Sequence, residues 1–276
     1  MMPPSRTQEK QVKLGLEGRN VLITGGSMGI GKACARLFSE EQANVSIAAR
    51  TPETLEQAAK EIAAETGGRV VWFPGDMTLQ VDVDDVVQQT TKSLGSVDIL
   101  VTCAGSSPGG LIEGLTEEEW ASSLNLKFMG YVRSMRAVLP QMRERGSGAI
   151  VLVIGNDGLK PTYWETTAGA ANAAGINVAS SLAEQYAPYG IRVNTVNPGP
   201  VDTQRWDGLE KAMARDMGIT QKEAHDFAVS SIPLGRIAEA DEIANLVVFL
   251  ASDRASFING AHILIDGAQR KAKMDR

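Results

Sequence analysis

The glycine-rich segment Thr24-Gly-Gly-Ser-Met-Gly-Ile-Gly31 follows a short apolar run, Asn20–Thr24, and precedes a helical pattern. Gly25 permits a sharp turn between strand and helix, Gly29 lets a phosphate approach the backbone, and Gly31 allows the helix and the strand to pack closely. The N-terminus of the helix then presents free N–H groups and a partial positive charge to an anion. The segment therefore predicts dinucleotide binding, and it carries no information about proton transfer.

Apolar and helical segments alternate along the rest of the chain. The apolar segments are rich in β-branched residues and apolar on both faces, as expected for parallel strands covered by helices. Strands are predicted at residues 20–24, 44–49, 69–73, 97–102, 148–154, 191–196 and 262–265. Helices are predicted at residues 31–42, 53–65, 81–94, 117–145, 167–189 and 239–251. The alternation predicts one α/β domain, Rossmann-like and doubly wound, with a mainly parallel seven-stranded sheet flanked by helices.

The chain shows no interdomain linker and no internal repeat. We expect a disordered tail at residues 1–15, the dinucleotide-binding domain at residues 16–267, and a polar tail at residues 268–276. Residues 202–232 are the least patterned part of the domain. We interpret them as a helical insert over the C-terminal ends of the strands, where a substrate would bind.

Composition excludes several classes of function. The formal net charge is −6 and no strongly basic stretch occurs, so nucleic acid is not an expected partner. No apolar run approaches the roughly 20 residues that cross a bilayer, and no secretory signal is evident. Cys34 and Cys103 lie far apart in apolar segments, as buried thiols of a reduced, cytoplasmic protein would. Two histidines and no Cys-x-x-Cys pair predict no metal site.

The end of the second predicted strand bears on the choice of cofactor. Sites that prefer NAD usually place an acidic side chain there to bond the ribose 2′-hydroxyl. This chain has Ala49-Arg50-Thr51 instead. A guanidinium matches a 2′-phosphate, so Arg50 favours NADP, with NAD as the alternative.

The order and spacing of further segments resemble the short-chain dehydrogenase/reductase family, from about Leu16 to Gly267. Besides the glycine-rich segment, the matching features are Asp76 after the third strand, Thr102-Cys-Ala-Gly105, Leu124-Asn-Leu126, Asn197-Pro-Gly-Pro-Val-Asp-Thr203 and Ile265-Asp-Gly267. The resemblance implies a cofactor site formed by Gly25, Ser27, Met28, Gly29, Ile30, Gly31, Arg50, Asp76, Met77, Cys103, Ala104, Gly105, Asn172, Pro198, Gly199, Val201 and Thr203.

The family's catalytic residues are Ser, Tyr and Lys, helped by Asn. The Tyr follows the Ser by about 13 residues and precedes the Lys by four, one helical turn. That spacing places Gly155 at the Ser position, Ala168 at the Tyr position and Asn172 at the Lys position. Only the Asn has a counterpart, Asn125. Gly and Ala carry no transferable proton, so the family's standard mechanism requires substitutes here.

Substitutes are available in the segment that leaves the fifth strand. Tyr163 could act as the acid, Lys160 or Glu165 could modulate it, and Asn156 could donate to a carbonyl oxygen. Asn172 could still bond a ribose hydroxyl. The alternative is that Tyr163 and its neighbour Trp164 only form a wall of the pocket.

Three functional readings remain open on the sequence. The first is an NADP-dependent oxidoreductase acting on a carbonyl or alcohol with a rebuilt acid. The second is a non-redox enzyme of the same fold that performs an elimination, an aldol-type cleavage or a hydrolysis. The third is a catalytically silent, cofactor-binding subunit. The small residues of segment 168–175, by resemblance, predict a homodimer or homotetramer, or a hetero-oligomer with an active paralogue.

Overall fold

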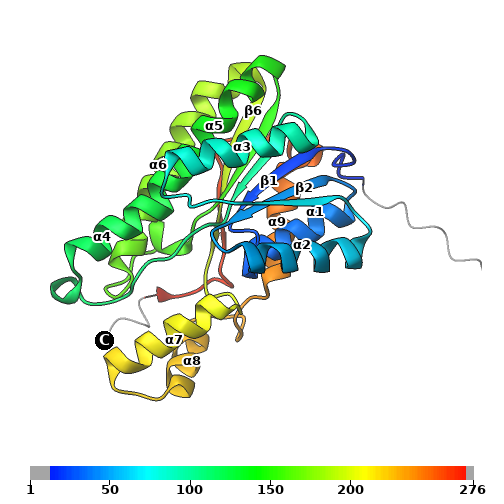
Figure 1. Ribbon diagram of the computed structural model, residues 1–276. Helices are drawn as coiled ribbons and strands as arrows, with labels where there is room; N and C mark the ends of the chain where they lie inside the picture. Colours follow the sequence, from blue (N-terminus) through cyan, green and yellow to red (C-terminus); the bar gives the residue numbers. More distant parts are fainter. Residues whose placement is uncertain (1–12, 272–276) are drawn as a thin grey trace, which may run out of the picture.

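A parallel β-sheet forms the centre of the computed structural model, which describes residues 13–271 (Figure 1). Its strands pair in the order β3-β2-β1-β4-β5-β6-β7, and every pair is parallel. The strands are β1 (Asn20–Thr24), β2 (Asn44–Ala49), β3 (Val70–Pro74), β4 (Ile99–Thr102), β5 (Gly148–Val153), β6 (Ile191–Pro198) and β7 (His262–Ile265). The predicted Rossmann-like α/β class with seven strands is confirmed.

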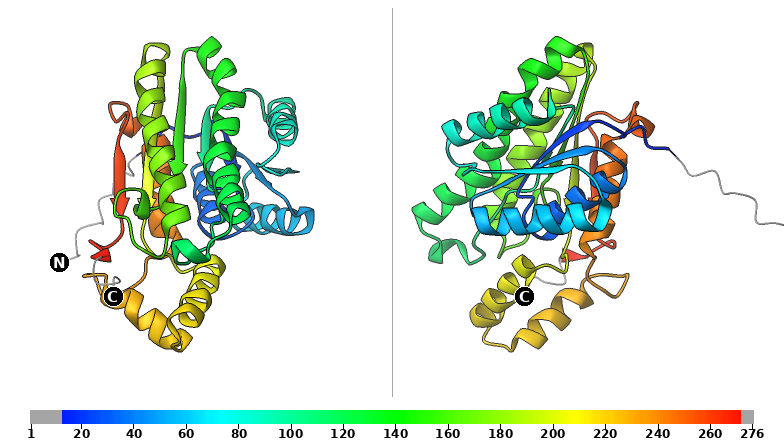
Figure 2. Two further views of the ribbon diagram at one scale, coloured as in Figure 1. Left: turned by 90° about the vertical axis from the view of Figure 1, so that its left-hand side faces the viewer. Right: turned by 45° about the vertical axis from the view of Figure 1, so that its right-hand side comes forward.

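Helices cover both faces of the sheet (Figure 2). One face carries α1 (Gly29–Glu40), α2 (Pro52–Thr66) and α9 (Ala240–Ala251); the other carries α3 (Gln80–Leu94), α5 (Gly130–Arg145) and α6 (Thr166–Tyr186). Successive side chains of a strand point to opposite faces, so each strand contributes to both cores. In β1, Val21 and Ile23 belong to the core under α1 and α9, whereas Leu22 belongs to the core under α5.

The strand order reverses between β1 and β4. Strands β2 and β3 follow β1 in one direction, and β5 to β7 follow β4 in the other. At such a switch point the segments that leave two adjacent strands diverge and open a crevice at their C-terminal ends. Here the crevice lies between the loop from β1 to α1 and the segment that begins at Cys103.

The region predicted as one helix at residues 117–145 has three parts. These are α4 (Glu117–Ser123), a π-helical segment (Leu124–Met129) and α5. A capping box begins α4, because Thr116 and Glu119 each accept a hydrogen bond from the other's backbone N–H. A π turn contains more residues than an α turn, so it changes which side chains face the sheet on either side of it. The prediction of a continuous helix is therefore wrong at Leu124–Met129, where the helix is of the π type.

The predicted helical insert contains a helical hairpin, α7 (Gln204–Met217) and α8 (Gln221–Ser230), which projects from the C-terminal edge of the sheet (Figures 1 and 2). A separate apolar cluster around Trp164 and Met213 packs inside it. None of the helices within residues 13–271 is long and apolar enough to span a membrane.

Both ends of the chain extend past the described residues. The predicted disordered N-terminal tail lies outside them for residues 1–12, as do residues 272–276 of the predicted C-terminal tail. In the described part of the predicted C-terminal tail, Gln269 and Lys271 are buried. These two side chains therefore pack against the domain, and the boundary at residue 268 stays a prediction.

Candidate cofactor and substrate site

A cavity of about 310 Å³ lies along the loop from β1 to α1, and we call it the glycine-loop cavity. Two backbone approaches shape the loop. A Cβ on Gly31 would lie 2.1 Å from the carbonyl oxygen of Gly25, and a Cβ on Gly25 would lie 2.6 Å from the backbone nitrogen of Ala104. Gly25 and Gly29 also have positive φ angles of 74° and 52°. The loop therefore requires glycine where the sequence predicted it.

Helix α1 begins at the floor of this cavity. Its N-cap, Met28, makes no side-chain capping hydrogen bond, and its first turn contains no acidic residue. The first N–H groups of the helix thus have no side-chain acceptor there. They and the helix dipole suit a bound anion such as a phosphate.

The predicted cofactor residues divide between two cavities. The glycine-loop cavity is lined by Gly25, Ser27, Met28, Gly29, Ile30, Gly31, Arg50, Asp76, Met77, Cys103, Ala104, Gly105 and Thr203. Arg50 is exposed, and its guanidinium makes no hydrogen bond or ion pair within residues 13–271. Asp76 is held in place, because its Oδ1 accepts from the backbone N–H of Thr78 at 2.9 Å.

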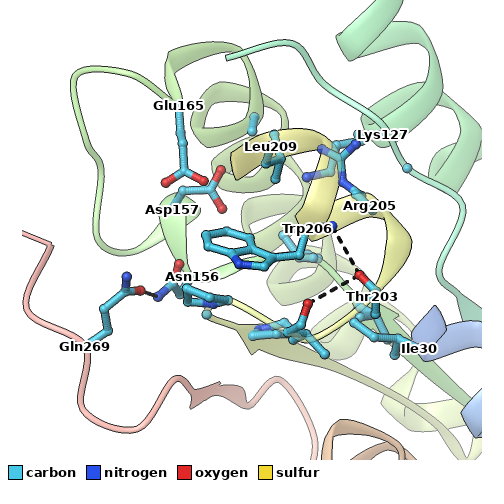
Figure 3. Close-up of a pocket in the computed structure, with 18 of the residues that line it drawn as sticks. Ile30, Lys127, Asn156, Asp157, Glu165, Thr203, Arg205, Trp206, Leu209 and Gln269 are labelled. Atoms are coloured by element: carbon cyan, nitrogen blue, oxygen red, sulfur yellow. Dashed lines mark hydrogen bonds between the residues drawn. The ribbon is translucent and has the colours of Figure 1, made fainter. Parts of the chain in front are cut away.

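A second cavity, of about 160 Å³, adjoins the first, and we call it the tryptophan pocket (Figure 3). The two cavities share five lining residues: Ile30, Cys103, Gly105, Thr203 and Arg205. The predicted residues Pro198, Gly199 and Val201 line only the tryptophan pocket. The shared wall makes the two cavities a single site at the C-terminal edge of the sheet.

Two indole rings border the tryptophan pocket. Trp206 comes from α7, and its Nε1 donates to Glu210 at 2.5 Å. Trp164 comes from the segment between β5 and α6, and its Nε1 donates to Asp216 of α7 at 2.9 Å. Trp164 is only 6% exposed, so it joins that segment to the helical hairpin through a buried contact.

Gly155 and Asn172 meet at the carboxylate of Asp157, and Ala168 lines the pocket that Asp157 also lines. A Cβ on Gly155 would lie 2.6 Å both from Nδ2 of Asn172 and from Oδ1 of Asp157. Asn172 donates to that same Oδ1 at 2.7 Å, and Ala168 lines the pocket. Asn172 is buried and engaged in this bond, and it is not among the residues that line either cavity.

Charged side chains surround the tryptophan pocket (Figure 3). Lys127 comes from the π-helical segment, Arg205 from α7, and Asp157 and Glu165 from the segment after β5. Burial lowers the pKa of both Lys127 and Arg205 from their ordinary values, while nearby Asp157 opposes this shift in each case. Glu165 accepts from Lys271 at 2.5 Å.

Tyr131 also lines this pocket, but its hydroxyl is engaged. It donates to the backbone carbonyl of Val153 at 2.8 Å. Burial raises the pKa of Tyr131 well above its ordinary value, and nearby Cys103 raises it further. This hydroxyl is therefore a weak acid whose proton is already directed at the protein backbone.

The structure does not bring the two predicted catalytic residues to the pocket. Oδ1 of Asn125 accepts from Arg133 at 2.7 Å, and Asn125 lines neither cavity. The π turn accounts for this, because it presents Lys127 to the pocket in place of Asn125. Tyr163 is 38% exposed and borders a separate small cavity behind Trp164.

The other suggested substitutes have mixed placements. Glu165 and Asn156 line the pocket as expected. Lys160, however, is paired with Asp266 at 2.6 Å and does not line it. The Nδ2 of Asn156 is directed at Gln269, 2.7 Å away, so this amide braces the C-terminal segment.

Sequence reasoning missed several residues of the pocket: Lys127, Tyr131, Asp157, Arg205 and Lys271. Lys127 lies two residues from the predicted Asn125, so only the local helix type decides between them. Asp157 follows β5 closely, and a carboxylate at the C-terminal end of a central strand is a usable signal. Lys271 lies far away in sequence, and no local pattern places it here.

Comparison with known proteins agrees with this architecture. The family model described as enoyl-(acyl carrier protein) reductase matches residues 25–268. A 3-oxoacyl-[acyl-carrier-protein] reductase of Thermotoga maritima is 33% identical over 252 residues, which are 91% of this chain and 98% of that protein.

Solved structures agree as well. L-sorbose reductase from Gluconobacter frateurii, complexed with NADPH and L-sorbose, has a TM-score of 0.87 at 33% identity, covering 94% of this chain and 98% of that one. NAD+-bound xylitol dehydrogenase has a TM-score of 0.87 at 26% identity, covering 91% and 98%. Fold, loop and relatives together define a dinucleotide-binding α/β protein. The chain belongs to the short-chain dehydrogenase/reductase family.

Proposed function

We propose that this protein is an NADP(H)-dependent oxidoreductase that interconverts a carbonyl group and an alcohol on a small molecule. The observation that carries the proposal is the shared wall of the glycine-loop cavity and the tryptophan pocket. A ligand seated along the glycine loop would reach the pocket at Gly105, Thr203 and Arg205. Relatives that are reductases, one of them complexed with NADPH, support the same reading.

A nicotinamide dinucleotide fits the residues present. The close approaches at Gly25 and Gly31 leave a loop without side chains beside the uncapped start of α1, where a pyrophosphate would bind. Asp76 and Met77 would flank the adenine at the other end of the cavity. Pro198 to Thr203 would hold the nicotinamide end.

Arg50 supports NADP over NAD. Its exposed guanidinium lies on the rim of the cavity with no protein partner among the described residues, so binding a 2′-phosphate breaks no existing ion pair. A phosphate held by two parallel N–H bonds uses the planar geometry of this side chain.

Gly155, Ala168 and Asn172 are proposed to stand where relatives carry their Ser, Tyr and Lys. Their placement supports this, because Gly155 and Asn172 meet at the carboxylate of Asp157, and Ala168 lines the pocket that Asp157 also lines. The catalytic roles proposed from sequence for Asn125 and Tyr163 have no support from their placement.

Several residues of this chain would each have a separate role in the proposed reaction. When bound, the nicotinamide supplies or accepts a hydride. Trp164 and Trp206 exclude water from the reacting group. Asp157 fixes Asn172 through its Oδ1. The remaining requirement is a group that moves a proton at the carbonyl oxygen.

We also propose that copies of this chain associate with one another. An exposed face of α6 carries small residues, among them Ala170 and Ala173, and large apolar side chains are exposed near β7, with Phe257 fully exposed. A second copy of the chain would cover such surfaces, so we expect a homodimer or homotetramer. The free thiols of Cys34 and Cys103 suit a reduced, cytoplasmic location.

Cofactor titration tests the proposal. NADPH and NADH are added separately, and binding is followed by quenching of the four tryptophans and by thermal shift. Oxidation of NADPH is then measured with a panel of ketones and aldehydes. Tighter binding of NADPH and its oxidation with a carbonyl compound support the proposal.

Other outcomes would replace it. Binding without oxidation across the panel would favour a silent subunit. Conversion of a substrate without added cofactor, found by product analysis, would favour a non-redox enzyme.

A further inference from the structure

Seven ionisable side chains line the tryptophan pocket: Cys103, Lys127, Tyr131, Asp157, Glu165, Arg205 and Lys271. Most of them are unsuited to giving a proton to a substrate. Tyr131 directs its proton at a backbone carbonyl, and Glu165 is bound to Lys271. Cys103 shares a side-chain hydrogen bond with the buried Cys34. Arg205 donates to Oγ of Ser106 at 3.0 Å, and a guanidinium keeps its proton throughout the accessible pH range.

Lys127 and Asp157 are the exceptions. Within residues 13–271, the side-chain amine of Lys127 has no hydrogen bond or ion pair, although the residue is partly buried. Oδ2 of Asp157 is buried and, among the same residues, has no hydrogen-bond partner. Buried polar groups without partners are rare, and at a cavity they indicate groups that meet a ligand.

Lys127 is placed at the junction of the two cavities. A Cβ on Gly105 would lie 3.1 Å from Cγ and 3.3 Å from Cε of this lysine, so the side chain runs along the glycine. Gly105 lines both cavities. The aliphatic part of Lys127 therefore follows the shared wall, and its amine enters the pocket on the side where a dinucleotide would end.

We propose that Lys127 is the proton donor to the carbonyl oxygen during reduction, an inference that rests on the proposed oxidoreductase function. A reduced nicotinamide in the glycine-loop cavity would supply a hydride to the substrate carbon, and the Lys127 ammonium would give its proton to the carbonyl oxygen. The carbonyl becomes an alcohol, and the neutral amine regains a proton from water. Asp157, opposite, stabilises the charged form of the amine.

The charges around the amine support this role. Burial lowers the pKa of Lys127, and the cations Arg205 and Lys271 lower it further. The carboxylates Asp157 and Glu165 oppose the shift. A lysine poised below its ordinary pKa gives up its proton more readily than an exposed one and is a better match to neutral pH.

The rates of reduction and oxidation should depend on pH in opposite directions. Reduction requires the ammonium, so its rate falls as pH rises through the pKa of Lys127. Oxidation of the alcohol requires the neutral amine, so its rate rises over the same interval. Both changes are centred below the ordinary lysine value of 10.5.

The test compares Lys127→Met, Lys127→Arg and the control Lys92→Met, which removes an exposed lysine from the last turn of α3. We expect Lys127→Met to lose about 10²- to 10⁴-fold in kcat for reduction. Lys127→Arg keeps the charge but cannot release a proton, so it stays slow. Both should keep NADPH binding and thermal stability, and Lys92→Met should match the unmodified protein.

A second readout does not need turnover. Trace acetylation with acetic anhydride, followed by mass spectrometry, gives the pH at which each amine becomes reactive. We expect the pH midpoint for labelling of Lys127 to lie below that of Lys92. NADPH should slow the labelling of Lys127 and leave that of Lys92 unchanged.

The outcomes separate the two proposals. If the unmodified protein reduces no carbonyl compound, the proposed function fails and the role of Lys127 fails with it. If the protein is active and Lys127→Met retains kcat within about tenfold, below the usual contribution of a general acid, only the role of Lys127 is overturned. A Lys127 midpoint equal to that of Lys92 would also overturn it.

Discussion

The glycine-loop cavity and the tryptophan pocket lie at the same edge of one sheet, yet they are built in different ways. The first is shaped by backbone: positive φ angles, close approaches of main-chain atoms and the start of a helix. The second is shaped by side chains that come from α7, the π-helical segment, the segment after β5 and the C-terminal segment. The proposed phosphate binding therefore depends on a local sequence, whereas the proposed proton chemistry depends on how distant segments pack.

The largest expected effect is on the backbone-built cavity. In Gly31→Val, a Cβ would lie 2.1 Å from the carbonyl oxygen of Gly25, so the loop must shift. We expect NADPH affinity to fall by more than about 100-fold, or about 2.7 kcal/mol, measured by tryptophan quenching. The control Gly208→Ala adds a methyl group with no heavy atom within 4 Å and should bind normally. Retained affinity in Gly31→Val would remove the loop from the proposed site.

The second prediction concerns the pocket. Gly155 has a φ of 149°, and its Cβ would meet Asn172 and Asp157. Introducing a side chain by Gly155→Ser should therefore cost about 1–3 kcal/mol of unfolding free energy. The cost should shrink in an Asp157→Ala background, because one of the two colliding atoms is gone. Chemical denaturation of the unmodified protein, the two single variants and the double variant measures the unfolding free energies. Equal costs of Gly155→Ser in both backgrounds would refute the steric explanation.

A smaller effect on NADPH binding is expected for Arg50, at the rim of the glycine-loop cavity. A charged hydrogen bond contributes about 1.5–3 kcal/mol, so Arg50→Ala should weaken NADPH binding by about tenfold to 100-fold. NADH lacks the 2′-phosphate and should bind as before. Titration of both cofactors, with Lys92→Ala as the control, measures the difference. Equal losses for NADPH and NADH would show that Arg50 does not read the phosphate.

The smallest effect is expected for Tyr163→Phe. The side chain lies outside the tryptophan pocket, so kcat should change by less than about twofold, and stability by no more than about 0.5 kcal/mol, as for other surface substitutions. Steady-state kinetics and thermal unfolding measure both quantities. A large loss of kcat at normal stability would return the acid to Tyr163, through a rearrangement of the segment that carries it.

The same contrast explains what the sequence could predict. The bounds of β1, β2 and β7 follow directly from short β-branched runs, and the glycines of the loop follow from motif spacing. The π turn between α4 and α5 leaves no periodic signal, because six residues are too few to change a hydrophobic pattern. The resemblance predicts a role for Asn125, and nothing in the sequence signals that Lys127 faces the pocket. Lys271 reaches Glu165 across 106 positions of sequence, a contact that only the folded sheet creates.

The bond between Nε1 of Trp164 and Asp216 has a consequence for hydrogen exchange. The indole is buried under α7, so its N–H can exchange with solvent only when the helical hairpin separates from the segment after β5. That single proton therefore records how often the pocket opens. Its exchange rate, read by NMR, would set a lower limit on the rate at which the hairpin separates from that segment.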